Sequence, residues 1–387
     1  MRRIRALEII SGFAVEGPLG GIERFGLELA QAMDQTCVSP LVCGLWEYGT
    51  PSERSWMEVL ELNGVDAFVA ADWVGHSPYR SFWRALQEVR EHITGRVDII
   101  HSHCQFGDLI SLLLRKRLGA QAVVRTVHNE QEWVKRPWRR LLLTHLAYPC
   151  ALDAEIGVAR KVVDNLDRRP VARLLRRRAT LIHNGVNLSR FDNIRLDRRG
   201  KRSDLGLPED AFVVGTVGRL APEKGHAVLL DAAALVLRRF PQVRFLIVGS
   251  GQLEHQLKRH AQRLSIEQQL TFTGPRQDVE ELLGVMDLYV SSSIREALPM
   301  ALLEAMAAAL PIVATRASGN VELIEDGITG CLVPASSPEC LADAISLLVP
   351  DPSRAAAMGE RARSCATDVF SIEEVARLHA DLYTRLL

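Results

Sequence analysis

Residues 291–315 read SSSIREALPMALLEAMAAALPIVAT, where the end of one strand, a helix and a second strand follow one another. The runs DLYVSSS, ending at Ser293, and PIVAT, ending at Thr315, have the length and apolar character of buried strands. The segment from Pro299 to Leu310 between them consists of strong helix formers. A strand–helix–strand order of this length is typical of parallel strands, so the stretch predicts an α/β fold.

The helix in this stretch is apolar on every face except at Glu304. A helix that is apolar all round is normally buried, and a buried carboxylate is costly unless it is paired. We therefore expect Glu304 to meet the hydroxyls of a ligand or a buried partner. Pro299 suits the first helical turn, where no amide donor is needed, and the amides just behind Glu296 should be free to face an anion.

Short β-branched runs alternate with helical patterns along the whole chain, and the cycle runs twice. This pattern predicts two facing Rossmann-like, doubly wound domains with ligands in an interdomain cleft at the carboxyl ends of the strands. The charged, turn-rich segment 187–209 reads as the connection between them. We expect an N-terminal domain over 1–190, a C-terminal domain over 191–370, and a helix over 371–387 that crosses back to the first domain.

The composition is that of a globular protein, with 47% hydrophobic residues and a formal net charge of zero. No apolar run reaches the roughly 18 residues that a membrane span needs. The first segment, MRRIRALEIISGF, reads as a strand rather than a signal peptide. Seven scattered cysteines without a C-x-x-C pair fit a reducing compartment, so we expect a cytoplasmic protein.

The zero net charge hides a basic segment, since residues 133–202 contain 18 Lys and Arg against 6 Asp and Glu. Trp133 and Trp138 lie among the cations of 133–140, and further arginines fill 168–178. Three interpretations stay open: a solvated face, contact with an anionic membrane at its inner surface, or nucleic acid. No nucleic-acid module is recognisable, so no nucleic-acid partner is expected.

Two loops have the residues of a phosphate site. Gly20 and Gly21 precede a helix expected near Ile22, and its N-terminal amides could face an anion. Arg219 and Lys224 follow a buried strand, where two cations suit a diphosphate. The alternatives are a tight strand-to-helix turn at the glycines and a solvated loop at the cations.

Histidines end two of the predicted strands. His128 ends AVVRTVH, while His101 and His103 end VDIIHSH. Such histidines can donate hydrogen bonds to sugar hydroxyls or act on protons. We interpret H-S-H as placing the two imidazoles on opposite faces of the chain, and we expect one of that pair to be a core residue and no metal pair to form there.

Several familiar motifs are missing. The chain has no Asp-x-Asp triplet, no G-x-x-x-x-G-K-[ST] loop and no G-x-S-x-G elbow. Gly249 and Gly251 begin a dinucleotide fingerprint, but Glu254 replaces its third glycine. A nicotinamide-dependent oxidoreductase is therefore disfavoured.

Taken together, the residues resemble glycosyltransferase family 4, whose members have the GT-B fold. GGIE near the start, HNGVN, VGRLAPEKG and LIVGSG are similar to landmarks of that family. The most specific is REALPMALLEAMAAALPIVAT with its E-x₇-E, followed by SGNVELIEDGITGCLVP. The resemblance covers nearly the whole chain.

The resemblance implies a retaining, metal-independent hexosyltransferase that uses a nucleotide-diphosphate sugar as co-substrate and no other cofactor. Its acceptor would be a glycan or a lipid-linked glycan in cell-envelope or exopolysaccharide synthesis. It implies a catalytic set of His128, Glu296, Arg219 and Lys224. Donor binding would use Gly218, Arg219, Lys224, Gly249, Glu296, Leu298, Pro299, Met300 and Glu304, and the acceptor or phosphate loop would use Gly20, Gly21 and Glu23.

Two positions depart from the family pattern. Ala297 and Leu298 stand where many members have Gly-Phe, and Ala309 stands where a glycine is common. Ala297 would restrict a backbone that needs an unusual conformation near the sugar. The competing hypothesis is a catalytically silent protein of the same fold that binds nucleotide sugars.

Overall fold

The structure is a computed structural model that describes residues 2–15, 20–73, 78–133, 136–192 and 197–387. The chain forms two compact units. Of the described residues, unit 1 contains 2–15, 20–185 and 372–387, and unit 2 contains 186–371.

Unit 1 is built on a seven-stranded sheet in which every neighbouring pair is parallel. The strand order is β3-β2-β1-β4-β5-β6-β7. The strands are β1 (Ile4–Ile10), β2 (Val38–Glu47), β3 (Asp66–Asp72), β4 (Ile99–Ser102), β5 (Ala122–Val127), β6 (Ala154–Gly157) and β7 (Thr180–Leu181).

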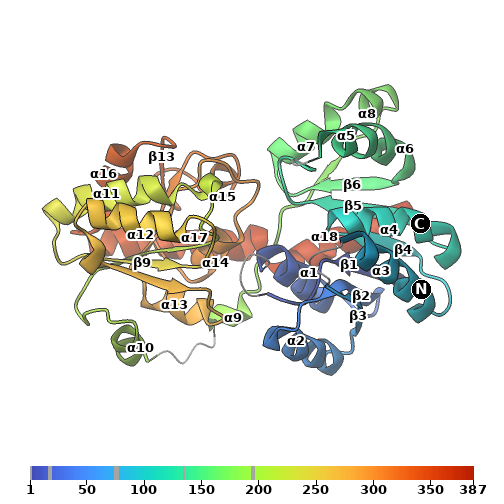
Figure 1. The fold of residues 1–387 in the computed structure, drawn as a ribbon, viewed down its shortest axis with the longest axis horizontal. Coiled ribbons are helices and arrows are strands. Elements are labelled where there is room, and N and C mark those ends of the chain that lie inside the picture. Colours follow the sequence, from blue (N-terminus) through green and yellow to red (C-terminus); the bar gives the residue numbers. More distant parts are fainter. Residues whose placement is uncertain (1, 16–19, 74–77, 134–135, 193–196) are drawn as a thin grey trace. The chain divides into compact units, whose positions relative to one another are not determined.

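Helices connect these strands, as parallel pairing requires. They are α1 (Gly21–Ala32), α2 (Pro51–Leu62), α3 (Pro78–His92), α4 (Gln105–Leu118), α5 (Pro137–Arg139), the π-helical η1 (Arg140–Ala147), α6 (Tyr148–Ala151), α7 (Arg160–Asp167) and α8 (Pro170–Leu174). The last helix of the chain, α18 (Ile372–Leu386), returns to unit 1 and packs on α1 (Figure 1). Its Tyr383 hydroxyl donates a hydrogen bond of 2.7 Å to Glu8 on β1.

Unit 2 repeats the design with a six-stranded parallel sheet in the order β10-β9-β8-β11-β12-β13. Its strands are β8 (Val213–Val217), β9 (Arg244–Val248), β10 (Leu270–Gly274), β11 (Leu288–Ser291), β12 (Ile312–Thr315) and β13 (Cys331–Val333). Its helices are α9 (Ser189–Asp192), α10 (Arg198–Asp204), η2 (Pro222–Lys224), α11 (His226–Arg239), α12 (Glu254–Arg263), η3 (Glu267–Gln269), α13 (Val279–Val285), α14 (Met300–Ala307), α15 (Asn320–Leu323), α16 (Pro338–Leu348) and α17 (Pro352–Phe370).

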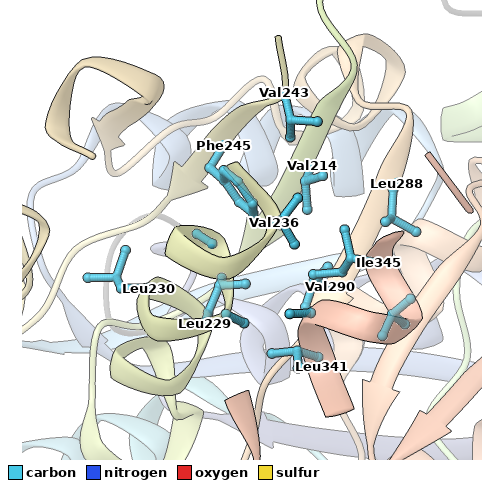
Figure 2. Packing of buried hydrophobic residues seen from close by; sticks show 14 of the residues in the cluster. Val214, Leu229, Leu230, Val236, Val243, Phe245, Leu288, Val290, Leu341 and Ile345 are labelled. Atoms are coloured by element: carbon cyan, nitrogen blue, oxygen red, sulfur yellow. The ribbon is translucent and has the colours of Figure 1, made fainter. Parts of the chain in front are cut away.

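The core of unit 2 shows why its strands are continuous apolar runs. Helices cover the sheet, and buried side chains of β8, β9, α11 and α16 interlock, among them Val214, Phe245, Val236 and Ile345 (Figure 2). Strands buried in this way need no polar alternation. The packing holds the strand ends, from which the functional loops leave, in fixed positions.

The α/β class with parallel sheets is as predicted, but three details differ. Strand β3 has no counterpart among the predicted strands, because DAFVAAD lies near the sheet edge and mixes apolar and charged residues. The unit boundaries lie after Gly185 and after Ser371. Described parts of the segment 187–209 pack within unit 2 instead of forming an open connection, as shown by buried Arg202, which bonds to Asp287.

In each sheet the strand order reverses at one point, between β1 and β4 in unit 1 and between β8 and β11 in unit 2. Ligands of open α/β sheets bind outside the carboxyl ends of the strands at such switch points. We therefore expect ligand sites at the loops that follow β1, β4, β8 and β11. None of the helices that the structure describes is long and apolar enough to cross a membrane.

Candidate active site

The loop after β8 brings Lys224 to the switch point of unit 2. Lys224 ends the short helix η2, and Gly225 follows it with φ at +64°. A Cβ atom at Gly225 would lie 2.1 Å from the Ser292 carbonyl oxygen, so only glycine fits here. This close approach fixes the Lys224 loop against the segment that follows β11.

Lys224 and Glu296 meet directly. The Lys224 ammonium donates to Glu296 Oε2 at 2.5 Å, and the Ser293 hydroxyl donates to the same oxygen at 3.1 Å. Both charged side chains are partly exposed, at 22% and 15%. The pair is thus held in place yet open to a ligand that could exchange partners with it.

Arg219 lies in the same loop in a different state. Its guanidinium donates to Glu223 Oε1 at 2.6 Å, and the side chain is 51% exposed. An exposed pair of this kind contributes little to stability, so Arg219 can leave Glu223 for an anion at low cost. Gly218 and Gly249 pack on each other, since a Cβ at Gly249 would lie 2.1 Å from the Gly218 carbonyl oxygen.

Glu304 lies in α14 and is 8% exposed. Its partner is Arg190 of α9, whose guanidinium donates to Glu304 Oε1 at 3.0 Å and contacts Glu280 at 2.5 Å. The expectation that a buried carboxylate needs a partner is thus met within the protein. Arg190 could not be identified as that partner from sequence, because the two residues are far apart in the chain.

The start of α14 lies where the sequence predicts a helix N-terminus. Pro299 is the N-cap and Met300 the first helical residue, one position later than expected. Leu298 is buried beside them at 6% exposure. Ala297 has no positive φ angle, so the alanine there imposes no strain of the kind that the missing glycine suggested.

Two residues of this region were missed by the sequence analysis. His226 and Tyr289 line a small hollow with Lys224. Burial and the nearby Lys224 charge lower the pKa of His226 to about 4, so it is neutral, and its Nδ1 has no hydrogen-bond partner. Burial raises the pKa of Tyr289 above its usual range, and the Glu304 charge adds to this. The position of His226 directly after Lys224-Gly225 was a signal that could have been used.

Unit 1 has a cavity of about 260 Å³ at the carboxyl ends of its central strands. Its lining combines side chains from helix α1, strand β2 and the loops after β4 and β5, including Glu23, Trp46, His103 and His128. The cavity lies where the strand order reverses between β1 and β4, as expected for a doubly wound sheet.

The prediction that His101 and His103 point to opposite faces is wrong. Both imidazoles contact Glu8 Oε2, at 3.1 Å from His101 Nδ1 and 3.0 Å from His103 Nε2. His101 and His103 are two residues apart, and side chains at that spacing in an extended chain lie on the same face, so the alternation itself brings both imidazoles to Glu8. His101 is the core member of the pair, with no exposed surface, while His103 lines the cavity.

Charge in this cluster is set by Glu8. Burial acts to raise the pKa of Glu8, but the charge of His101 and the hydrogen bonds from His101 and His103 hold it well below its usual range. Burial, helped by the His101 charge, lowers the pKa of His103 to about 4. His103 is therefore neutral and donates from Nε2 to an ionised Glu8, which leaves its Nδ1 as an acceptor.

His128 is next in this chain of contacts. Its Nε2 lies 3.3 Å from His103 Nδ1, and its own Nδ1 has no hydrogen-bond partner. Burial, then the charges of the neighbouring histidines, hold the pKa of His128 well below 6.5, with a small opposing effect of Asn184. His128 lines the cavity, and a neutral His128 that donates from Nε2 keeps a buried Nδ1 as an acceptor without a partner.

The glycine loop lies at the start of α1. Gly20 is the N-cap, and its amide donates to Glu23 Oε2 at 3.2 Å. Burial raises the pKa of Glu23, against hydrogen bonds that lower it. The Glu23 carboxyl group thus already accepts a hydrogen bond from an amide at the helix N-terminus. This leaves fewer free amides there to bind a phosphate. Residues 16–19 of the loop lie outside the described residues.

One group in the described chain could hold a metal ion. Ligand atoms of Glu8, His101 and His103 lie within 4.8 Å of one another. Each of these atoms already takes part in hydrogen bonds, including that from the Tyr383 hydroxyl to Glu8. In the structure these atoms form a closed hydrogen-bond network with Tyr383.

The basic segment is less uniform than its sequence suggests. Trp133 is 7% exposed and Arg169 is 3% exposed, the latter bonded to Glu155, so neither contributes to a surface. Trp138 is 59% exposed. Lys135 lies outside the described residues.

Two families of known proteins match this chain. The family model described as "Glycosyltransferase Family 4" matches residues 19–190, and "Glycosyl transferases group 1" matches 197–364. The chain belongs to this glycosyltransferase family. It is 31% identical over 315 residues to D-inositol 3-phosphate glycosyltransferase 2 of Catenulispora acidiphila, covering 76% of this chain and 72% of the relative.

Two further proteins are informative. A galactosyltransferase of Escherichia coli, named UDP-Gal:alpha-D-GlcNAc-diphosphoundecaprenol alpha-1,3-galactosyltransferase, is 27% identical over 303 residues, which is 74% of this chain and 75% of that one. The crystal structure of Anabaena HepE in complex with UDP and glucose superposes with a TM-score of 0.81 at 21% identity, over 99% of this chain and all of that one. The glycosyltransferase thus has the GT-B fold.

Proposed function

We propose that this glycosyltransferase moves a hexose, with retention of configuration and without a metal ion, from a nucleotide-diphosphate sugar to a glycan or lipid-linked acceptor in cell-envelope or exopolysaccharide synthesis. The contact between Lys224 and Glu296 at the switch point of unit 2 carries the proposal. The names of the relatives support it, since one uses UDP-galactose and a lipid-linked acceptor. The retaining course rests on the resemblance to family 4.

The cations of unit 2 would bind the diphosphate. Lys224 and Arg219 are now balanced by Glu296 and Glu223, and both pairs are partly exposed. A diphosphate can take over both cations and gain charge-assisted hydrogen bonds. As the bond to the sugar breaks, the cations stabilise the charge that develops on the leaving diphosphate, which commonly dominates catalysis. Two cations in these positions would make a metal ion unnecessary.

Two carboxylates would bind hydroxyls of the donor. Glu296, held by Ser293, would accept from the sugar once Lys224 turns to the phosphate. Glu304 is oriented by Arg190 through Oε1, and its Oε2 would accept from the ribose. The backbone at Leu298, Pro299 and Met300 leads into α14, whose positive end would face the phosphate.

Unit 1 would bind the acceptor. His128 would place its Nδ1 near a reacting or recognised hydroxyl. Glu23 borders the same cavity, and Gly20 and Gly21 lie next to it at the start of α1. His103 and Glu8 would hold the imidazole in this tautomer.

Variants of the Lys224 and Glu296 pair test the proposal. Lys224→Ala and Glu296→Gln should each lower the rate of sugar transfer roughly 100-fold or more, as loss of a preorganised charge does. Lys258→Ala, in an exposed pair of the same unit, is the matched control. A screen of UDP-, GDP- and ADP-sugars by thermal shift identifies the donor. Near-normal turnover in either variant, or loss of activity with a chelator that Mn²⁺ restores, would refute the mechanism.

The protein would also contact the anionic inner face of the membrane. Trp138 at 59%, Leu141 at 59% and Leu142 at 50% exposure lie on α5 and η1, next to Arg139 and Arg140. Apolar side chains bordered by arginines suit a surface of anionic lipid. The helix α8 packs on η1 and adds Leu174, which is 81% exposed.

Vesicle binding tests this contact. Replacing Arg176, Arg177 and Arg178 by Glu should weaken binding to vesicles that contain phosphatidylglycerol, because each basic residue near the surface contributes about 1 kcal/mol. Pure phosphatidylcholine vesicles are the control. Unchanged binding would mean that the basic segment is only a solvated surface.

The assays of donor binding and sugar transfer also test the competing hypothesis. Donor binding without any transfer would favour a catalytically silent binding protein.

A further inference from the structure

The cavity of unit 1 has an acidic lining. Glu23, Asp108 and Glu132 line it, and its described lining contains no lysine or arginine. The histidines in the lining, His103 and His128, have pKa values lowered by burial and are neutral near pH 7. Among the residues that the structure describes, a ligand in this cavity therefore meets carboxylates and no free cation.

The cation behind this lining is fully engaged by the protein. Arg125 of β5 has no exposed surface. Its guanidinium donates to Glu132 at 2.8 and 3.2 Å, to Glu155 at 2.8 Å and to Asp108 at 3.2 Å. The carbon of the guanidinium lies 4.2 Å from the centre of the Tyr148 ring. Three carboxylates thus surround one guanidinium, with Arg169 as a second cation on Glu155 alone.

Asp108 is the member of this network that has an acceptor atom without a hydrogen-bond partner. It lines the cavity and is 4% exposed, and only its Oδ2 bonds to Arg125. Its Oδ1 is buried and has no hydrogen-bond partner. Burial raises the pKa of Asp108 to about 7; Arg125 opposes this, Glu132 adds to it, and the Ser102 hydroxyl opposes it. A buried carboxylate oxygen without a partner is costly, and a ligand donor would remove that cost.

We propose that this cavity selects an unphosphorylated acceptor sugar, neutral or bearing an amino group, and that Asp108 is the specificity-determining residue, accepting a hydrogen bond at Oδ1 from a hydroxyl or ammonium group of that sugar. The proposal rests on the proposed function, because it names the acceptor class of the same site. The cavity of about 260 Å³ lies just below the roughly 300–1,000 Å³ of typical ligand pockets, so it suits one sugar ring.

The chemistry of the lining excludes a phosphate and favours hydroxyls. A phosphate beside Asp108 and Glu132 would be repelled by their charge and would find no lysine or arginine in the described lining. Asp108 and His128 line the cavity, and each has a buried acceptor without a partner, Oδ1 and Nδ1, to which a sugar hydroxyl would donate. Trp46 and Phe106 offer apolar ring surface in the same cavity, as sugar rings require. A diphosphate further along a lipid-linked acceptor is compatible, provided that it lies outside the cavity.

Three matched probes test the selectivity on the full chain. Methyl glucoside, methyl glucosaminide and methyl glucoside 6-phosphate are compared at pH 8 by saturation-transfer NMR, with the proposed donor's nucleotide diphosphate present. The neutral and amino sugars should bind roughly tenfold or more tightly than the phosphate, as expected from like-charge repulsion in a shielded site. Equal or tighter binding of the phosphate would overturn the proposal.

Asp108→Asn then assigns the selectivity to one residue. The variant keeps the size of the side chain and removes its charge. It should lower affinity for the amino sugar roughly tenfold and narrow the discrimination against the phosphate. Asp66→Asn, at an exposed position of β3, is the control. It should change neither the affinity for the amino sugar nor the ratio of the amino-sugar affinity to the phosphate affinity. An unchanged ratio in folded Asp108→Asn, verified by circular dichroism, would remove Asp108 from the proposal.

Failure of this inference is separable from failure of the proposed function. Donor binding, followed by thermal shift with nucleotide sugars, depends on Lys224 and Glu296 in unit 2 and should be unaffected by Asp108→Asn. Loss of donor binding in the unmodified protein would count against the transferase mechanism. Normal donor binding with a preference for the phosphorylated probe would count against the acidic cavity alone.

Discussion

The two switch points of this protein use charge in opposite ways. In unit 2 the loop cations Lys224 and Arg219 lie in partly exposed pairs that a ligand can open. In unit 1 the cation Arg125 is buried beneath carboxylates and cannot be released without exposing three negative charges. Two domains of one topology can therefore present a cationic site for a diphosphate and an acidic site for hydroxyl groups. The fold supplies the position, and the charge state of a few side chains supplies the selectivity.

The largest effect should come from removing the buried cation of unit 1. Arg125→Met leaves Asp108, Glu132 and Glu155 without their shared partner, and breaking a buried ion pair costs about 3–5 kcal/mol. All six tryptophans lie in unit 1, so their fluorescence during urea unfolding reports on this unit alone. We expect the fluorescence midpoint to fall sharply.

The control for this prediction is Arg178→Met, since the Arg178 side chain is 80% exposed in its pair with Asp167. An exposed pair contributes at most about 1 kcal/mol. If Arg125→Met were no more harmful than the control, the carboxylates of unit 1 would not depend on Arg125, and the contrast between the two sites would fail.

Much of this contrast was open to prediction from sequence, but not all of it. Strand runs and glycine turns place Lys224 and Glu296 at strand ends, because local patterns determine where strands stop. The partners Arg190 for Glu304 and Glu8 for His103 depend on tertiary packing between distant segments, which no spacing encodes. The buried state of Trp133 was hidden for the same reason, because its neighbours in sequence are basic.

The next largest effect should be a loss of stability at low pH, and it should come mainly from the histidine cluster. His379 of α18 is buried beside His101, and burial first, then the His101 charge, lowers its pKa to about 3. A histidine in the unfolded chain has a pKa of about 6.5. Because the unfolded chain takes up a proton that the folded chain refuses, stability should be full above pH 6.5 and fall as the pH drops toward 3.

At pH 5 this one histidine should lower the free energy of unfolding by about 2 kcal/mol, from 1.36 kcal/mol per pKa unit. His379→Leu removes the titrating group and a buried Nε2 that lacks a partner. The variant should show a shallower loss of stability between pH 7 and pH 5, measured by tryptophan fluorescence in urea. His92→Gln, at an exposed position of unit 1, is the control. An unchanged pH slope in His379→Leu would mean that acid does not act through this cluster.

The smallest effect concerns the end of α14, the helix that holds Glu304. The Leu310 amide donates to Ala305 and the Ala309 amide to Met306, which is the Schellman arrangement that ends a helix. Ala309 takes the left-handed position with φ at +55°, where glycine avoids a steric cost of about 1–2 kcal/mol. Glycine also loses about 0.5–1 kcal/mol more chain entropy on folding. Ala309→Gly should therefore raise the stability of unit 2 by about 0.5–1 kcal/mol, seen as a higher unfolding midpoint by circular dichroism without a change in tryptophan fluorescence. A matched Ala308→Gly, one residue earlier at φ −78°, should instead be destabilising. If both variants lowered stability, the backbone at Ala309 would not be strained, and the family's preference for glycine at this position would need a cause other than helix termination.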